Sequence, residues 1–316
     1  MPTDRRTFLT AGALTMAGLA SSRTQASVAA DEGPAPAFRF CLNTSTIREA
    51  KLGIEKEVAI AAEAGYDGIE PWIPTLRDFV GKGGRLADLQ KQISDASLTV
   101  DSAIGFANWI VDDESKRRLA LEEARRDMEM LREIGGTRIA APPVGAHQAD
   151  AAKVDLAVAA ERFRALQDLG DQTGVVPQLE VWGFSKNLSR LSEVMYVVGE
   201  TGHPNACLLL DVYHLFKGGS DFTGLNLLSD QSMHVFHIND YPAEPPRAEM
   251  NDSHRVYPGD GIAPLKQILN AIGGAGRSIT LSLELFNRDY WKQDPLLVAK
   301  TGLAKMKASV EAATVE

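Results

Sequence analysis

The 316-residue chain has only two cysteines, Cys41 and Cys207. So few cysteines exclude a disulfide framework, and their wide separation excludes the paired spacing of a zinc or thiol–disulfide site. Each lies in an apolar segment, which predicts two reduced residues of the core. The chain also lacks a basic patch: its net charge is −9, with Lys and Arg scattered along it. A nucleic-acid partner is therefore not expected, because an acidic protein repels a phosphate backbone.

A glycine-rich phosphate loop is missing as well. The first strand-like segment continues into LNTSTIREAKLG, which has no G-x-G-x-x-G pattern, and this argues against an open dinucleotide-binding sheet. Short apolar segments instead alternate with amphipathic ones, such as the helical patterns at 54–65 and 113–136. The segments predicted as strands are 37–45, 66–72, 98–106, 137–145, 175–183, 206–214, 233–240 and 278–286. Eight strand–helix units predict a (β/α)8 barrel.

The N-terminus carries an export pattern. Arg5 and Arg6 precede Phe8, Leu9 and a short apolar stretch, which is typical of a twin-arginine signal. We expect residues 1–30 to be this signal peptide, 31–36 a linker and 37–316 the barrel catalytic domain. The predicted location is periplasmic or extracytoplasmic. An ordinary secretory signal and an uncleaved anchor remain alternatives.

Four consecutive predicted strands each carry an acid or an imidazole toward their carboxyl end: Glu180, Asp211, His237 and Glu284. In a barrel of this type the active site lies at the carboxyl ends of the strands. One such acid is commonly a helix cap or an ion-pair partner, whereas four on successive strands indicate a divalent-metal site. Three carboxylates and one imidazole suit Mn²⁺ best, with Mg²⁺, Co²⁺ or Zn²⁺ as alternatives. His214 follows Asp211 and either contacts the substrate or fixes a neighbour by hydrogen bonding.

The chain from residue 31 onward resembles the xylose isomerase-like TIM barrels, the sugar phosphate isomerase/epimerase family. The segments that carry the resemblance are LNTSTI, AGYDGIE, LEVW, LLLDVYH, FHIND, HRVYPGDG and SLELFNRDYW. The resemblance implies that Glu180, Asp211, His237 and Glu284 hold the metal and that Glu180 and Glu284 move the proton. It also implies that His214 and Arg255 contact the substrate.

Aromatic residues near the predicted mouth suit a sugar, because ring faces stack on the apolar face of a pyranose. These are Trp72, Phe106, Trp109, Trp182, Phe286, Tyr290 and Trp291. Closing the barrel or forming an oligomer contact is the alternative for each. The residues that we expect to contact the substrate are His214, Arg255, Glu70, Trp72, Phe106, Trp182 and Asp240. The long polar segment 241–261 predicts a lid or a binding loop.

The predicted reaction is proton transfer next to a carbonyl group, through an enediolate that a metal stabilises. The same side chains serve isomerisation, epimerisation and elimination. We therefore expect a metal-dependent sugar isomerase or epimerase, with a lyase or dehydratase of a keto sugar, keto-glycoside or inosose as the alternative. A sugar-binding module stays open, and the net charge argues against an apurinic endonuclease. We expect an unphosphorylated sugar or cyclitol as substrate, a partner sugar dehydrogenase, and a homo-oligomer as one possible state.

Overall fold

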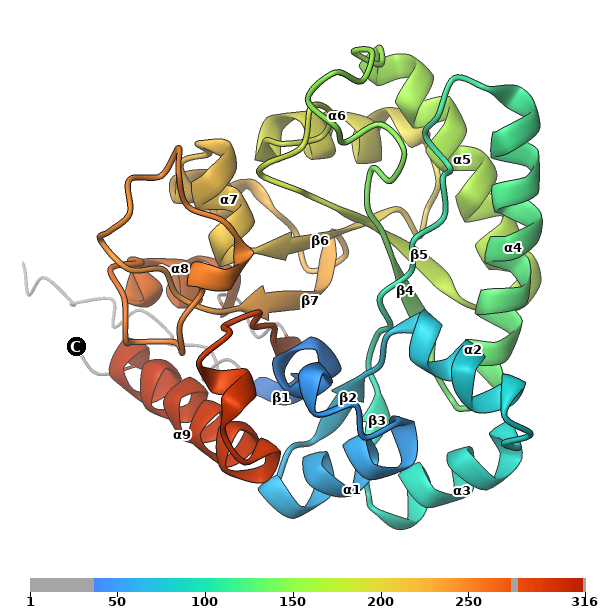
Figure 1. Cartoon of the computed structure of the whole chain (residues 1–316). Coiled ribbons are helices and arrows are strands. Elements are labelled where there is room, and N and C mark those ends of the chain that lie inside the picture. The colour runs from blue at the N-terminus through green and yellow to red at the C-terminus, as the bar shows by residue number, and fades with distance from the viewer. Residues whose placement is uncertain (1–36, 274–277, 315–316) are drawn as a thin grey trace, which may run out of the picture. The chain divides into compact units, whose positions relative to one another are not determined.

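Eight parallel strands curl into a barrel with helices on its outside, as the computed structural model shows for residues 37–273 and 278–314 (Figure 1). The strands are β1 (Ala37–Asn43), β2 (Gly68–Glu70), β3 (Thr99–Val100), β4 (Arg138–Ala141), β5 (Val176–Glu180), β6 (Cys207–Asp211), β7 (Met233–Ile238) and β8 (Ser278–Leu283). Their order in the sheet is β3-β2-β1-β8-β7-β6-β5-β4. The predicted (β/α)8 barrel is confirmed. The predicted signal peptide and linker lie outside the described residues.

The two ends of this sheet, β3 and β4, are joined through the backbone that follows β3. Ala103 N donates to Arg138 O at 3.2 Å, and Ala140 N donates to Ala103 O at 2.8 Å. Ile104 N donates to Pro71 O at 3.0 Å on the other side. Residues 103–104 thus bridge the ends of β2 and β4, although the regular part of β3 has only two residues.

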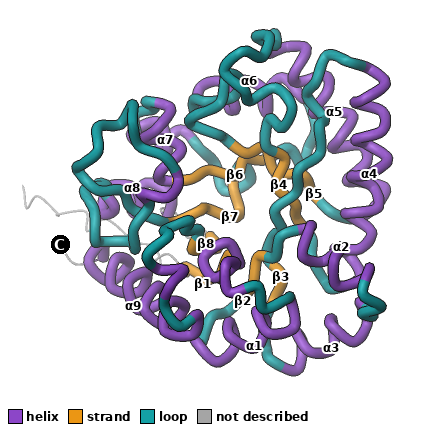
Figure 2. Tube along the Cα trace, in the orientation of Figure 1, coloured by secondary structure: helices purple, strands orange, loops and turns teal. Residues whose placement is uncertain are grey.

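Helices surround the strands (Figure 2). They are α1 (Ile54–Ala64), α2 (Ile73–Gly81), α3 (Leu86–Asp95), α4 (Glu114–Glu133), α5 (Leu156–Thr173), α6 (Leu191–Thr201), α7 (Val212–Gly218), α8 (Leu265–Gly273) and α9 (Pro295–Thr314), with short 3₁₀ turns η1 (Thr44–Ala50), η2 (Phe222–Leu227), η3 (Asp252–His254) and η4 (Tyr290–Lys292). The two helical patterns noted in the sequence correspond to α1 and α4. None of the helices that the structure describes has the length and apolarity needed to cross a lipid bilayer.

All eight predicted strands end earlier than expected, and for two of them the local reason is clear. The segment 137–145 stops at Ala141 because Pro142 and Pro143 follow, and proline lacks the N–H that a central strand needs. The segment 206–214 stops at Asp211, whose Oδ1 accepts a hydrogen bond from His214 N at 2.7 Å and caps α7. His214 therefore lies in the first turn of a helix and not on a strand.

The inside of the barrel has an apolar layer below a polar one. Leu209 of β6 and Val235 of β7 pack together with Ala140 and Ile104. Side chains two residues further along a strand share the same face, so Asp211 and His237 lie directly above this layer. Both cysteines are buried and free, as the sequence predicts.

Candidate active site

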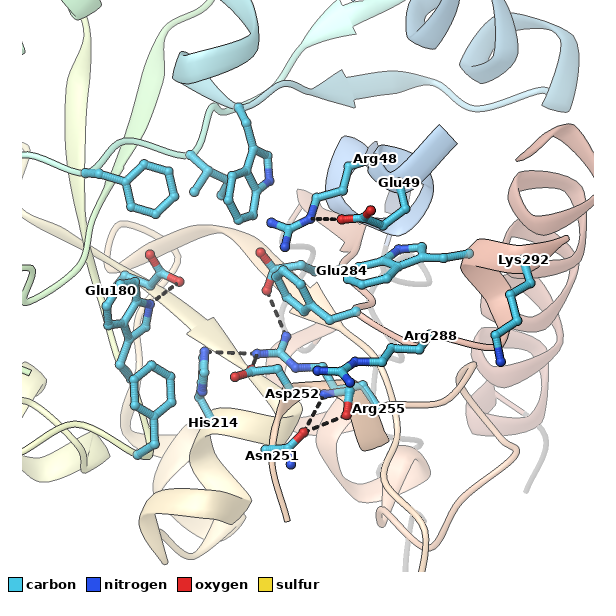
Figure 3. Close-up of a pocket in the computed structure, with 18 residues that line it drawn as sticks. Arg48, Glu49, Glu180, His214, Asn251, Asp252, Arg255, Glu284, Arg288 and Lys292 are labelled. Atoms are coloured by element: carbon cyan, nitrogen blue, oxygen red, sulfur yellow. Dashed lines mark hydrogen bonds and ion pairs between the residues drawn. The ribbon is translucent and has the colours of Figure 1, made fainter. Parts of the chain in front are cut away.

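A cavity of about 850 Å³ opens at the carboxyl ends of the strands, within the size range of small-molecule sites. Much of its wall is aromatic. The rings that line it are Trp72, Phe106, Trp182, Phe184, Phe286 and Trp291. Glu180, His214, Arg255 and Glu284 also line it, and Figure 3 shows Glu180 and Glu284 entering the pocket from different sides. The described residues thus place one aromatic cavity over the polar layer of the barrel.

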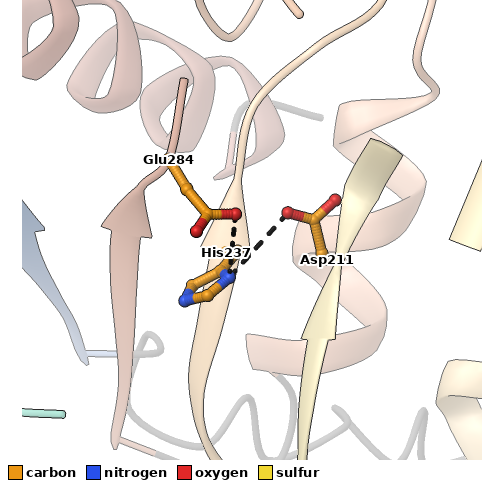
Figure 4. Close-up of side chains that lie close together, drawn as sticks. All are labelled: Asp211, His237 and Glu284. Atoms are coloured by element: carbon orange, nitrogen blue, oxygen red, sulfur yellow. Dashed lines mark ion pairs between the residues drawn. The ribbon is translucent and has the colours of Figure 1, made fainter. Parts of the chain in front are cut away.

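Three of the four predicted metal ligands form a compact buried cluster. One ligand atom each of Asp211, His237 and Glu284 lies within 4.8 Å of the other two (Figure 4). His237 Nδ1 is 3.3 Å from Glu284 Oε2 and 3.9 Å from Asp211 Oδ2. They converge because β6, β7 and β8 are neighbours and all three residues lie at or just beyond the carboxyl ends of these strands.

Glu70 sets the orientation of the His237 ring. His237 Nε2 donates to Glu70 Oε2 at 3.0 Å, and Asn43 Nδ2 and Ser282 Oγ donate to the same oxygen at 2.9 and 2.7 Å. With Nε2 as the donor to Glu70, the ring is turned so that Nδ1 faces Asp211 and Glu284, where it can give a lone pair to a metal once its own proton has left. Within the described chain, buried Nδ1 has no hydrogen-bond partner. A nitrogen so oriented beside two carboxylates fits a divalent metal ion.

Glu180, the fourth predicted ligand, lies beside this cluster without joining it. Its Oε1 accepts a hydrogen bond from Trp182 Nε1 at 2.9 Å, while buried Oε2 has no partner among the described residues. Burial, and then the negative charge of Glu284, raise the pKa of Glu180 to about 8. Without a metal, Glu180 is therefore mostly protonated at neutral pH, and its unpaired oxygen is available to a cation or to a substrate.

Glu284 has the opposite preference. Burial alone raises its pKa, but the positive charge of His237 and then that of Arg255 lower it well below the usual value. Burial disfavours the charged form of His237 too, yet Glu284 and Glu70 raise its pKa above the ordinary range. Two carboxyl groups at one cavity thus prefer different protonation states, the usual mark of an acid and base pair.

Arg255 reaches into the centre of the site. It is completely buried, and its Nη1 donates to Asp211 Oδ2 at 2.9 Å and to Glu284 Oε2 at 2.8 Å. Its Nη2 donates to Asp252 Oδ1 at 2.5 Å and to His214 Nε2 at 3.0 Å. Burial, followed by the charge of Arg255, lowers the pKa of His214. His214 is therefore a neutral acceptor that helps to hold the guanidinium.

Asn43 is a site residue that the sequence analysis did not name. Its Nδ2 donates to Glu70 Oε2 at 2.9 Å and to Glu284 Oε1 at 3.2 Å, and its Oδ1 accepts from Trp72 Nε1 at 2.9 Å. One amide thus fixes two carboxylates and one wall of the cavity. Its place at the end of β1, in LNTSTI, is the signal that could have found it.

Several residues expected at the cavity lie elsewhere. Glu70 lies behind His237 and does not line the cavity. Asp240 accepts hydrogen bonds from the backbone N–H groups of Tyr241, Gly259, Gly261 and Ala263, so it holds the loop 241–261 in place. Trp109 was expected at the mouth, and this prediction is wrong. Its ring is buried against Phe163, with Nε1 donating to Pro142 O at 2.9 Å.

Tyr290 also stays outside the cavity lining, because it stacks on Tyr257 at 4.1 Å. The expected aromatic residues that do line the cavity are Trp72, Phe106, Trp182, Phe286 and Trp291. Phe184 was not predicted; it stacks on Trp182 at 5.3 Å. The loop 241–261 contributes Asn251, Asp252, Ser253 and Arg255 to the wall, which agrees with a binding loop.

Comparison with known proteins matches the chain to a single fold family by sequence and by structure. A family model described as xylose isomerase-like TIM barrel matches residues 58–309. An inosose isomerase of Bacillus velezensis is 26% identical over 280 residues, which are 87% of this chain and 96% of that protein. A 3-dehydroshikimate dehydratase of Pseudomonas aeruginosa is 24% identical over 234 residues, which are 74% of this chain and 36% of that longer protein. The solved structure of the IolI protein with a zinc atom has a TM-score of 0.79 at 22% identity and covers 88% of this chain and 100% of that one.

Proposed function

Because the chain belongs to the xylose isomerase-like TIM barrel family, we propose that it is a divalent-metal-dependent isomerase or epimerase of a sugar, keto sugar or inosose. The observation that carries this proposal is the pair of Glu180 and Glu284. They line one cavity with opposite protonation preferences, next to a cluster that fits a cation. A proton can therefore leave a substrate carbon on one side and return from the other.

Asp211, His237 and Glu284 would hold the metal, and Glu180, whose Oε2 has no partner among the described residues, would join them as the fourth ligand when it is ionised. When bound, the ion polarises the substrate carbonyl and stabilises the negative charge of an enediolate. A donor set of carboxylates and one imidazole favours Mn²⁺ in our proposal, and Mg²⁺, Co²⁺ and Zn²⁺ remain compatible with it. The relative IolI was solved with zinc.

The protein's own groups supply the proton transfers. Glu284, which is ionised, takes the proton from the carbon next to the carbonyl group. Glu180, when it carries a proton, returns it to the opposite face of that carbon, and this inverts its configuration. Return to the neighbouring carbon gives an isomer instead. Arg255 and His214 line the cavity beside Glu284, where they can bind substrate oxygens and oppose the developing charge.

A lyase or dehydratase is the second candidate. The observation that favours it is the protonated state of Glu180, since an acid in this position can donate its proton to a departing β-hydroxyl or β-alkoxy group. The similarity to a 3-dehydroshikimate dehydratase points in the same direction. The substrate in this case is a keto sugar, a keto-glycoside or an inosose.

Deuterium exchange tests the reaction. The Mn²⁺-loaded protein is incubated in deuterated water with a panel of keto sugars and inososes, and NMR identifies the product. We expect deuterium at the carbon next to the carbonyl group, loss of exchange in Glu284→Gln, and slowed product formation in Glu180→Gln. Glu122→Gln, an exposed change on α4, is the control. A wild-type protein that binds these sugars and exchanges no deuterium contradicts the proposal and favours a binding module.

We also propose that the protein is exported by the twin-arginine route and acts outside the cytoplasm, on the strength of Arg5 and Arg6 before the apolar stretch. A cyclitol or glycoside lacks the required carbonyl group, so a partner sugar dehydrogenase must then oxidise it first. Fusing residues 1–36 to a reporter protein tests the export. We expect the reporter in the periplasmic fraction, and in the cytoplasm when both arginines are changed to lysine.

A further inference from the structure

Arg48 projects into the same cavity from η1, directly after β1, and is held there by aromatic rings. Its guanidinium carbon lies 4.9 Å from the ring centroid of Trp72, 5.3 Å from that of Phe286 and 5.2 Å from that of Trp291. The indoles are themselves fixed, because Trp72 Nε1 donates to Asn43 and Trp291 Nε1 donates to Ser45 O at 3.0 Å. A guanidinium held against ring faces keeps the N–H groups at its edge free for another partner.

These N–H groups have no strong partner in the described part of the chain. Among the described residues Arg48 forms an ion pair with Glu49 alone, with 4.0 Å between Arg48 Nε and Glu49 Oε1, and both side chains are about half exposed. Such an exposed pair contributes roughly 0–1 kcal/mol. Arg288 lines the same cavity, is exposed, and forms no ion pair with any described residue. In Figure 3 the side chains of Arg48 and Arg288 both extend toward the pocket.

Of the other cations of the wall, buried Arg255 is paired with Asp252 and Glu284. Lys292 Nζ is 2.7 Å from Asp289 Oδ1, but both side chains are exposed, so this pair is also weak. Arg48 and Arg288, with Lys292 beside them in the lining, are therefore cations that a ligand can neutralise. The cavity thus has a group of cations on one side, although the net charge of the chain is −9.

The position of Arg48 relative to the chemistry sets the size of the ligand. Arg48 and Arg255 contact the same ring, that of Phe286, at 5.3 and 5.0 Å. Because both distances are measured to the same ring centroid, the two guanidinium carbons cannot be further apart than their sum. A six-carbon sugar spans roughly 5–6 Å from its first to its last carbon, at about 1.5 Å per bond. One small molecule can thus have its reacting carbon at Glu284 and a terminal group at Arg48.

We propose that Arg48 and Arg288 bind a negatively charged substituent of the substrate, a carboxylate or a phosphate, so that the substrate is an acidic sugar or cyclitol derivative. This inference rests on the proposed function, because it places the reacting carbon at Glu284. Guanidinium groups pair with both anions through parallel N–H bonds. A carboxylate is the better match, since the described residues that line the cavity include no glycine-rich nest of backbone N–H groups for a phosphate.

Binding measured by calorimetry on the Mn²⁺-loaded protein tests this inference without turnover. The matched ligands are glucuronate, glucose and glucose 6-phosphate. We expect the wild type to bind glucuronate at least about tenfold more tightly than glucose. Arg48→Gln removes this preference, Arg48→Lys retains part of it, and Arg288→Gln reduces it. Tighter binding of glucose 6-phosphate than of glucuronate supports the site and assigns it to phosphate.

Arg118→Gln, an exposed change on α4, is the control and leaves the preference unchanged. Equal affinity of the wild type for the acidic and neutral sugars overturns the inference. A loss of affinity for both sugars alike in Arg48→Gln also overturns it, because that pattern marks a purely structural role. Failure of the deuterium exchange with every sugar contradicts the proposed reaction and leaves this binding preference intact.

Discussion

Replacing Arg255 by methionine tests how the buried negative charges of the site are neutralised. Arg255 Nη1 bridges Asp211 Oδ2 and Glu284 Oε2, two of the atoms that would ligate a metal. Asp211 Oδ2 also accepts from Asn239 Nδ2 at 2.9 Å, so both lone pairs of this oxygen are in use. A cation bound through these oxygens must displace the guanidinium. We therefore predict that Arg255 is the counter-ion of the metal-free site and competes with the metal.

The expected magnitude follows from the burial of all three groups. Removing one partner of a buried ion pair costs about 3–5 kcal/mol of the free energy of unfolding. One kcal/mol changes the melting temperature of a domain of this size by about 2–4 °C. The metal-free Arg255→Met variant should thus melt roughly 10 °C below the wild type. Metal should restore most of this loss, because the ion neutralises Asp211 and Glu284. The variant should also bind Mn²⁺ about tenfold more tightly or better, since no guanidinium has to leave.

Thermal denaturation with a chelator and with added Mn²⁺, together with calorimetric titration of the metal, measures both effects. Arg77→Met is the matched control, because Arg77 Nη2 lies 2.6 Å from Asp127 Oδ2 outside the cavity. It should lower the melting temperature equally with and without metal. Weaker metal binding by Arg255→Met would refute the competition. An unchanged melting temperature of its metal-free form would refute the role as counter-ion.

Three further changes test other parts of the structure. Burial raises the pKa of Glu57 from 4.5 to about 7. The unfolded chain therefore loses this proton at a lower pH than the folded chain does, and the free energy of unfolding falls as the pH rises from about 4.5 through 7. Glu57→Gln should remove up to about 3 kcal/mol of this loss, as urea denaturation at pH 5 and pH 8 would show. Glu70→Gln weakens the acceptor of His237 and should lower Mn²⁺ affinity about 10–100-fold with the fold retained, as measured by calorimetry and circular dichroism. Asp240→Asn puts an N–H₂ group opposite backbone N–H donors and should expose the loop 241–261 to limited proteolysis, whereas an unchanged digestion pattern would contradict this role.

The sequence predicted the fold, and it brought Asp211, His237 and Glu284 together as candidate metal ligands, because both depend on simple regularities. Apolar segments that alternate with amphipathic helices leave few architectures, and residues at the ends of adjacent parallel strands must meet at one edge. Asp211, His237 and Glu284 satisfy this rule on β6, β7 and β8. Trp182 and Phe286 follow the strand ends in the same way and line the cavity.

Other site features depend on contacts across the barrel, which periodicity does not encode. Glu70 and His237 lie on β2 and β7, and only their three-dimensional positions show that they bond to each other. Trp109 is an aromatic residue of the type expected at a sugar-binding mouth, yet it is buried against Phe163 and Pro142. The helical position of His214 was accessible from the sequence, because an Asp three residues earlier is a common N-cap.

The different roles of Glu180 and Glu284 follow from which segments surround them. Glu284 receives Arg255 from the loop after β7 and faces His237 of β7, so cations stabilise its charge. Glu180 ends β5 and receives only a neutral indole N–H from Trp182. The different protonation preferences of the two groups in the metal-free site thus follow from the order of strands and loops around the barrel. In the reaction that we propose, the same two carboxyl groups would serve epimerisation and elimination, and the cavity wall would decide between the two outcomes.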